Sequence, residues 1–360
     1  MPGARRTFVR MARQGLAAAA LCLGGLAHIA GTAEAAVPPA QRQALVDLYN
    51  AANGPAWTAN GNWLVGDPCD NGWFGIACGA GNTTVVRVDL PNNQLSGSLS
   101  ALGALVDLEN FDVLGNQLTG GIPPLSGLAV LGFFRVSSNQ LSGPLPDFSN
   151  LPGLYQFDAA GNQLSGPIPP LAGLPGLRSF NVAVNQLTGP IPPLAGLAGL
   201  AYFNVSGNQL SGPLPALAGL ADLQIFSAAG NQLTGSIPPL GGLVQLSYFS
   251  VAGNRLTGTA PDLAGLAALQ SFYVNNNQLS GPVPTAPASL VAGASALCPN
   301  LFVRSRSSAN DLAWNTATGQ TPWSNACPLP VAIPTLHGAA LALLTLVLAG
   351  VAALRLRGRP

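Results

Sequence analysis

Few side chains in this sequence could carry acid–base or metal chemistry. The only two histidines, His28 and His337, lie close to the two ends of the chain. Histidine is the commonest metal ligand and the usual base beside a serine or cysteine nucleophile. No phosphate-binding loop, dinucleotide-binding glycine motif, nucleophile elbow or calcium loop occurs either. We therefore expect no metal and no cofactor.

Three carboxylates are the remaining candidates for catalysis. Asp89, Asp112 and Asp158 share one outward column of a predicted sheet, in which the first two would lie about 4.8 Å apart on adjacent strands. That separation is close to the carboxylate spacing of a retaining glycoside hydrolase. The alternative, which we favour, is that these carboxylates are not catalytic and only keep a solvent-exposed face of the sheet soluble. We therefore predict that the protein is not an enzyme, with a glycoside hydrolase as the third hypothesis for its function.

The element that positions these residues is a 23-residue repeat. The string Asn-Gln-Leu-Ser/Thr-Gly occurs nine times at constant intervals of 23 residues, and only Arg255 interrupts it. This period lies in the range of leucine-rich repeats. The asparagines that mark the repeat are Asn93, Asn116, Asn139, Asn162, Asn185, Asn208, Asn231, Asn254 and Asn277.

Each repeat indicates one short strand followed by a turn. Phe180 and Val182 alternate with Ser179 and Asn181, which is the period-two pattern of a strand with one buried face. Asn185 can then bond to the backbone of its own and the neighbouring coil. Stacked copies predict a parallel sheet with a buried spine of phenylalanines. The spine consists of Phe111, Phe134, Phe157, Phe180, Phe203, Phe226, Phe249 and Phe272.

The run from Leu187 to Leu194 resembles the plant-type leucine-rich repeats of receptor kinases and polygalacturonase inhibitors, although the plant unit is usually one residue longer. The resemblance covers Val85 to Pro284. It implies an α/β solenoid, a right-handed horseshoe with a parallel concave sheet. Nine 23-residue repeats and disulfide-bonded caps would build it, because a solenoid exposes its core unless both ends are covered.

Four cysteines flank the repeats, two on each side. Of three possible connectivities, this placement favours Cys69 with Cys78 and Cys298 with Cys327. A zinc site is excluded because no Cys-x-x-Cys pair exists. The first pair resembles the N-terminal cap of plant-type repeats, and an amphipathic helix is expected before it, over 42–50. The tryptophans expected to cover the two ends of the core are Trp57, Trp63, Trp73, Trp314 and Trp323.

The N-terminus indicates export. Residues 1–35 combine an arginine-bearing start, the apolar run 16–30 and a small-residue cleavage site at Ala33-Glu34-Ala35, which together predict a signal peptide. The alternative is a retained anchor helix. Arg5 and Arg6 also resemble a twin-arginine motif, so the general and the twin-arginine export routes both stay open.

The C-terminus carries Ile333, Pro334, Thr335 and Leu336, then an uncharged apolar run over 338–354 and an arginine-rich tail. A plain membrane anchor is one interpretation. The order of these parts resembles the IPTL-type sorting signals of Gram-negative bacteria, which an exosortase-like transpeptidase recognises. That resemblance implies a bacterial protein held in the membrane before processing and then secreted or displayed on the cell surface. The family's Trp-Gly pair is replaced by Ala339-Ala340, so cleavage of the helix stays open.

The outward face of the concave sheet is the natural binding surface of a solenoid. Rings interleaved with adaptable polar groups suit a protein or polysaccharide ligand. The alternative is a structural surface or matrix component without a discrete ligand, in which single exposed rings are ordinary. The predicted ligand-binding residues are Phe133, Arg135, Asp158, Tyr202, Asn204, Tyr248 and Tyr273.

Charge excludes nucleic acid as a partner. Residues 36–330 hold seven arginines and no lysine against twelve acidic residues, a net charge of −5, whereas nucleic-acid binding needs a basic patch. The predicted organisation is a signal peptide at 1–35, an N-terminal cap at 36–84, repeats at 85–284, a C-terminal cap and linker at 285–330, and a sorting signal with a transmembrane helix at 331–360.

Overall fold

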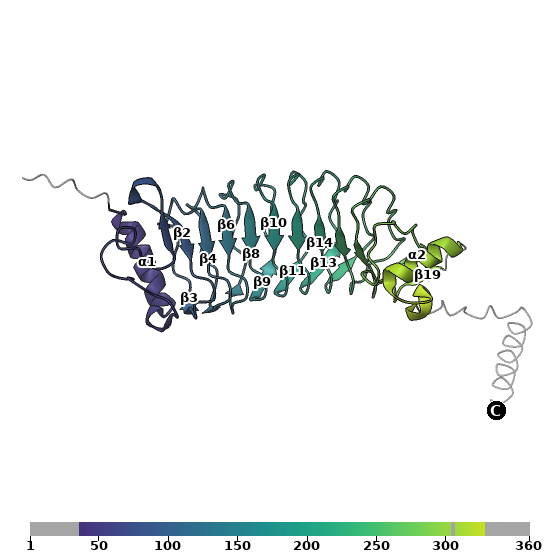
Figure 1. Cartoon of the computed structure of the whole chain (residues 1–360), viewed down its shortest axis with the longest axis horizontal. Helices are drawn as coiled ribbons and strands as arrows, with labels where there is room; N and C mark the ends of the chain where they lie inside the picture. The colour runs from purple at the N-terminus through teal and green to yellow at the C-terminus, as the bar shows by residue number, and fades with distance from the viewer. Residues whose placement is uncertain (1–35, 304–306, 328–360) are drawn as a thin grey trace, which may run out of the picture. The chain divides into compact units, whose positions relative to one another are not determined.

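The computed structural model describes residues 36–303 and 307–327, all of them within one compact unit (Figure 1). The predicted signal peptide, the Ile333–Leu336 signature and the apolar run 338–354 lie outside the described residues. Within the described part, no helix is long and apolar enough to cross a membrane.

A ten-stranded sheet runs along the array, with one strand from each coil (Figure 1). Nine strands are parallel, and each residue pairs with the residue 23 positions later, as Phe180 does with Phe203. The predicted solenoid of nine 23-residue turns is therefore confirmed. In spatial order the strands are β1 (Ile76–Cys78, antiparallel to β2), β2 (Val85–Asp89), β4 (Asn110–Asp112), β6 (Phe133–Arg135), β8 (Gln156–Asp158), β10 (Ser179–Asn181), β12 (Tyr202–Asn204), β14 (Ile225–Ser227), β16 (Tyr248–Ser250) and β17 (Ser271–Tyr273).

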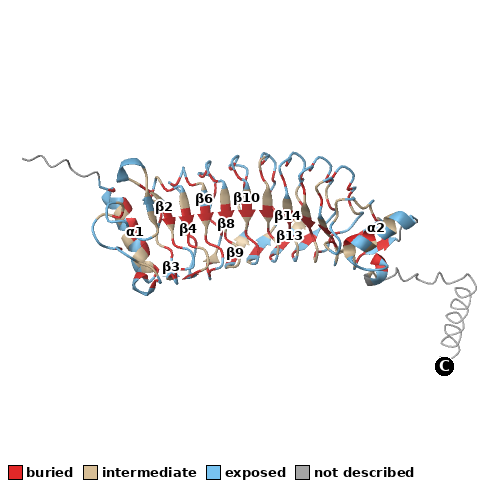
Figure 2. Ribbon diagram, viewed as in Figure 1, coloured by how far each residue is buried: buried red, intermediate tan, exposed pale blue. Residues whose placement is uncertain are grey.

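The phenylalanine spine is confirmed as the centre of the core. All eight rings have 0% exposure, and successive rings stack with centroids 5.4–5.7 Å apart. Phe148 takes the place of a repeat leucine and packs edge-on against Phe157 at 5.0 Å. Figure 2 shows the resulting buried band, in red, running through the coils between the two end helices.

The asparagine ladder makes the hydrogen bonds that the repeat predicted. Asn185 donates from Nδ2 to the carbonyl of Val182 in its own coil at 3.1 Å and to that of Ala159 in the preceding coil at 3.0 Å. Its Oδ1 accepts the N–H of Leu164 at 2.9 Å. Each amide therefore ties two coils together and satisfies backbone groups that the turn leaves inside the protein.

A second set of short strands follows the first in most coils, where the sequence had predicted only a turn. Leu187 is buried between exposed Gln186 and Thr188, an alternation too short to indicate a strand by itself. The strands are β3 (Ser96–Ser98), β5 (Gln117–Thr119), β7 (Ser142–Gly143), β9 (Gln163–Pro167), β11 (Gln186–Gly189), β13 (Gln209–Pro213), β15 (Gln232–Thr234), β18 (Ser280–Pro282) and β19 (Leu301–Val303). Five of them form a sheet in the order β15-β13-β11-β9-β7.

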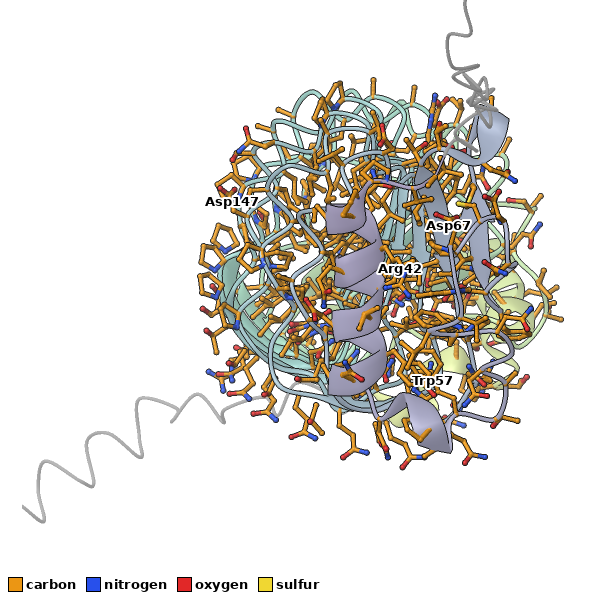
Figure 3. All side chains as sticks on the ribbon, turned by 90° about the vertical axis from the view of Figure 1, so that its left-hand side faces the viewer. Arg42, Trp57, Asp67 and Asp147 are labelled. Atoms are coloured by element: carbon orange, nitrogen blue, oxygen red, sulfur yellow. A yellow bond between two sulfur atoms is a disulfide. The ribbon has the colours of Figure 1, made fainter. Side chains whose placement is uncertain are left out.

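The N-terminal cap covers one end of the core with a helix and a tryptophan cluster. Helix α1 (Pro39–Ala51) begins with proline, which is well tolerated in a first helical turn. Trp57, Trp63 and Trp73 are at most 5% exposed, and Figure 3 views this end with α1 across the stack. Short 3₁₀ turns at Gly54–Ala56 and Ala80–Asn82 complete the cap, and the predicted Cys69–Cys78 disulfide is present.

Helix α1 also satisfies the first strand of the array. The buried Gln41 side chain accepts the N–H of Val85 at 2.9 Å and donates to the Asp107 carboxylate at 2.9 Å. In later coils the equivalent N–H bonds within its own coil, as that of Leu108 does to the carbonyl of Leu105, and at Val85 the cap helix supplies the acceptor instead.

The C-terminal cap contains one atypical coil that the sequence analysis did not detect. Asn300 lies 23 residues after Asn277 and makes the ladder bonds, accepting from the N–H of Leu279 at 2.9 Å and donating to the carbonyl of Val274 at 2.8 Å. Ser295 occupies the position of the core phenylalanine, and its hydroxyl accepts the N–H of Phe272 at 3.1 Å. A terminal repeat that departs from the consensus is expected at the end of a solenoid.

Helix α2 (Ser308–Thr318) closes this end of the core. Trp314 is fully buried, lies 6.2 Å from the ring of Phe272 and donates to the carbonyl of Pro284 at 2.9 Å. Trp323, in the 3₁₀ turn Trp323–Ala326, is also buried. The predicted Cys298–Cys327 disulfide is present, so both caps are disulfide-bonded.

Val184 is a strained position. Its φ is +56° and it is 64% exposed, whereas Gly207 and Gly230 occupy the same place in the next coils with φ of +65° and +63°. A β-branched residue is disfavoured in this region. We expect Val184→Gly to raise the free energy of unfolding by about 0.5–1 kcal/mol, and Gly207→Val to lower it by about 1–2 kcal/mol. Urea unfolding of both variants checks this, and a loss of stability in Val184→Gly would contradict it.

Candidate ligand-binding face

The predicted ligand-binding residues all lie on one surface, the strand face. We define the strand face as the outward residues immediately before and after the core phenylalanine in the ten-stranded sheet. Phe133 is 38% exposed, and the other six residues are half-buried. Parallel pairing at a constant 23-residue offset brings them into two columns. The structure therefore places the rings and polar groups side by side, as the alternation of buried and outward residues in each strand predicted.

Phe133 has an aromatic partner that the sequence analysis missed. The ring of Tyr155 lies 5.3 Å from that of Phe133, in the next coil, and Tyr155 is 47% exposed. Tyr155 stands two residues before the core phenylalanine, outside the two columns that were considered. The sequence signal that could have identified Tyr155 is an aromatic residue at a position where no other repeat carries a ring.

A charged group lies beside this aromatic pair. The Arg135 guanidinium makes an ion pair with the carboxylate of Asp112, whose side chain is 2% exposed. The Asp112 carboxylate also accepts the N–H of Leu114 at 3.0 Å. Asp112 is therefore engaged from two sides and is not an accessible member of a carboxylate pair with Asp89. Asp89 and Asp112 do pair in register on adjacent strands, as predicted, but the burial and ion pair of Asp112 disfavour the glycoside hydrolase hypothesis.

Asp158 occupies the next coil in the same column. Burial raises the pKa of its carboxyl above the ordinary value of 3.8, although hydrogen bonds from the N–H of Ala160 and the hydroxyl of Ser137 and the charge of Arg135 oppose the shift. The Ser137 hydroxyl donates to Oδ2 at 3.1 Å, and the Ala160 N–H to Oδ1 at 3.2 Å. The strand face thus holds a carboxylate that is costly to ionise.

We expect this burial to appear as a pH dependence of stability. Because the pKa of Asp158 is raised in the folded protein, its stabilising contribution is present below pH 3.8 and is lost as pH rises through the folded-state value. Asp158→Asn cannot titrate. Its unfolding free energy relative to wild type should therefore increase as pH rises from 3 to 6, in urea unfolding series. A difference that stays constant across that range would contradict the prediction.

Two further groups follow along the strand face. On β12, Asn204 donates to the Tyr202 hydroxyl at 3.1 Å and accepts from the Ser206 hydroxyl at 2.7 Å. On β16 and β17, the rings of Tyr248 and Tyr273 lie 5.7 Å apart. Each group presents an apolar ring beside polar atoms, which is a common composition of ligand-binding surfaces.

The three aromatic groups are spread along the sheet. Three strand spacings separate β6 from β12, and two more separate β12 from β16. At about 4.8 Å per strand, the distance from β6 to β16 is about 24 Å, the length of about seven residues of extended chain. Within the parts of the chain that the structure describes, no cluster of three metal-ligating acidic, histidine or cysteine side chains occurs.

Comparison with known proteins gives matches in structure. No family model matches the sequence, and no curated protein matches it either. The leucine-rich-repeat ectodomain of the plant membrane receptor kinase GASSHO1/SCHENGEN3 from Arabidopsis thaliana, in complex with CASPARIAN STRIP INTEGRITY FACTOR 2, is 30% identical with a TM-score of 0.60. That match covers 73% of this chain and 36% of the ectodomain chain.

Two other solved structures are similar to the same degree. The ectodomain of the Arabidopsis receptor kinase HAESA, in complex with an IDA peptide hormone ligand, is 28% identical with a TM-score of 0.56, covering 73% of this chain and 49% of that chain. A plant ice-binding protein is 28% identical with a TM-score of 0.62, covering 78% of this chain and 93% of that chain. These likenesses show a plant-type leucine-rich-repeat fold. The chain spans less than half the length of these two receptor ectodomains.

Proposed function

We propose that the protein is an exported leucine-rich-repeat binding protein that recognises an extended protein or polysaccharide ligand through its strand face. The observation that carries this proposal is the row of three aromatic groups, each beside polar side chains, along one sheet. Two similar ectodomains were crystallised in complexes, one with CASPARIAN STRIP INTEGRITY FACTOR 2 and one with a peptide hormone ligand, which supports ligand binding by this fold. An extended ligand lying across the strands would contact all three groups at once.

A binding experiment with a matched control tests the proposal. Full-length protein would be screened against surface polysaccharides, envelope proteins and extended peptides. A test variant changes Phe133, Tyr202, Tyr248 and Tyr273 to serine, and a control variant changes four exposed apolar residues away from the strand face, Val106, Val130, Val244 and Leu312, to serine. We expect the test variant to lose affinity by about a hundredfold or more, because several buried contacts are removed together, while the control binds like wild type.

Equal binding by the test variant and wild type, or no binding to any member of the panel, would contradict the strand-face proposal. Thermal unfolding of both variants shows whether a loss of binding comes from the changed ligand surface or from a destabilised fold. In the case of no binding, the structural surface or matrix component without a discrete ligand becomes the better explanation.

The periodic second sheet favours ice as a second candidate ligand. Gln186 and Thr188 are exposed on either side of the buried Leu187, and β11 pairs in parallel with β9 and β13, Gln186 with Ser165 and Thr188 with Gln209. A surface that repeats polar groups at a fixed strand spacing suits a periodic ligand, and a plant ice-binding protein is similar over 93% of its length. Ice-recrystallisation inhibition by wild type, absent after changing Thr188, Ser211 and Thr234 to lysine, would support this candidate.

We also propose that the two chain ends direct the protein to the cell surface or medium of a Gram-negative bacterium. The apolar run 338–354 and the signature Ile333–Leu336 would hold it in the membrane until an exosortase-like enzyme acts. Changing Ile333, Pro334, Thr335 and Leu336 to alanine should keep the full-length chain in the membrane fraction. Identical fractionation and mass of variant and wild type would argue for a plain anchor.

A further inference from the structure

A second concave site, the flank pocket, lies beside the strand face. Its volume is about 430 Å³, within the range of roughly 300–1,000 Å³ for small-molecule pockets. One wall is Tyr155, whose ring also contacts Phe133. The residues that line it are Tyr155, Arg178, Ala201, Asp222, Gln224 and Gln245.

The repeat explains why a pocket forms here. Tyr155, Arg178, Ala201 and Gln224 occupy the same position in four successive coils, two residues before the core phenylalanine. Three of these side chains are long and exposed. The small Ala201 leaves a gap one coil wide between them and forms the floor of the pocket.

Arg178 is held across the pocket by an arrangement that depends on a glycine. Its Nη1 donates to the Gly199 carbonyl at 2.8 Å and to the Asp222 carboxylate at 2.7 Å. A Cβ atom added at Gly199 would lie 2.3 Å from Nη1, and the backbone there is not in the left-handed region. Glycine at 199 is therefore needed for the space that the guanidinium occupies and not for backbone freedom.

The charges of the pocket define the ligand chemistry. Arg178 and Asp222 form an ion pair, so the pocket carries no net charge, and an anion would meet Asp222 while a cation would meet Arg178. The guanidinium keeps three further N–H donors, and the carboxylate keeps acceptor sites. The Gln224 and Gln245 amides supply both kinds of group, and the Tyr155 ring supplies an apolar surface.

We propose that the flank pocket binds a neutral saccharide. A sugar ring carries closely spaced hydroxyl groups that both donate and accept, together with an apolar face of C–H groups that can stack on an aromatic ring. Of the common ligand classes, it is the one that uses the ion pair, both amides and Tyr155 without needing a net charge. The flank pocket adjoins the extended-ligand site on the strand face, because its Tyr155 wall contacts Phe133, and its other lining residues lie outside that site.

Oligosaccharide titration of the full-length protein tests this proposal. The probes are neutral tetrasaccharides of glucose, mannose and galactose, with an oligomer of galacturonic acid as the acidic comparison, followed by calorimetry. Ala201→Gln fills the floor with the side chain that Gln224 carries stably at the same position of the next coil. Ser247→Gln makes the matched change one coil beyond Gln224, outside the residues that line the pocket.

We expect saturable binding of at least one neutral tetrasaccharide and weaker binding of the acidic oligomer. Ala201→Gln and Arg178→Met should each weaken the neutral sugar about tenfold or more, because each removes contacts inside the pocket. Ser247→Gln and a strand-face variant with serine at positions 202, 248 and 273, which keeps Phe133 against Tyr155, should bind like wild type.

Three results would overturn the proposal. They are an absence of binding by every neutral probe, a preference for the acidic oligomer, and unchanged affinity in Ala201→Gln. A sugar lost by the strand-face variant but kept by Ala201→Gln would assign the saccharide to the strand face. Loss only in Ala201→Gln and Arg178→Met establishes the flank pocket whether or not the strand face has a ligand of its own.

Discussion

Phe134→Ala is expected to lower the free energy of unfolding by about 3–5 kcal/mol, because it removes a buried ring and leaves a cavity. Phe134 has 0% exposure and stacks between Phe111 and Phe157 at 5.4 and 5.6 Å. Its neighbour Phe133 points the other way and is 38% exposed. Phe133→Ala should therefore cost about 1 kcal/mol or less, chiefly its contact with Tyr155.

Chemical denaturation of both variants measures the difference. The pair is a strict control, because the residue type, the strand and the substitution are the same and only the direction of the side chain differs. Because each coil contacts only its neighbours, the Phe134 variant should also lose protection from hydrogen exchange most strongly in the adjoining coils. Similar stability losses in the two variants would contradict the register of β6.

Asn231→Ala should lower the free energy of unfolding by about 3 kcal/mol, since three backbone groups lose their partner inside the protein. Its Nδ2 donates to the carbonyls of Val205 and Ala228 at 3.0 and 3.2 Å, and its Oδ1 accepts the N–H of Leu210 at 3.0 Å. Gln232→Ala, at the next residue, removes an exposed amide and should change stability by at most about 0.5 kcal/mol.

Urea unfolding of these two variants measures how much the asparagine column and the glutamine column each contribute to stability. The asparagine column would then be structural and the glutamine column would be free for another role, such as contact with a periodic ligand. A cost of less than about 1 kcal/mol for Asn231→Ala would show that water satisfies the turn backbone without the ladder.

Local residue types were sufficient to predict several features correctly. The residue types of Phe180 and Asn185 each recur at one position of a constant period. The pattern of a single repeat therefore predicts which side chains are buried and which bond to the turn backbone. The disulfide partners followed because Cys69 and Cys78 lie on one side of the array and Cys298 and Cys327 on the other. The residues expected on the outward face were also correctly brought together.

The features that were missed depend on contacts between coils. Strand β11 exists because its backbone pairs with β9 and β13, and three alternating residues could not indicate it. Asn300 was overlooked because the string around it, Asn300-Leu301-Phe302, no longer matches the consensus, although its amide makes the same bonds. Tyr155 was overlooked because its column was assigned neither to the core nor to the sheet.

The sequence alone determined the solenoid, its spine, its asparagine ladder and its disulfide-bonded caps, because a repeat stacked on itself has only one set of neighbours 23 residues away. The tertiary structure alone decided which outward residues are available to a ligand. Asp112 and Asp158 look alike as residue types, yet one is ion-paired with Arg135 and the other carries a raised pKa. The flank pocket likewise depends on the tertiary structure. It arises where the long side chain of Arg178 crosses Gly199 to reach Asp222, and the residue types in these coils do not indicate that the coils make this contact.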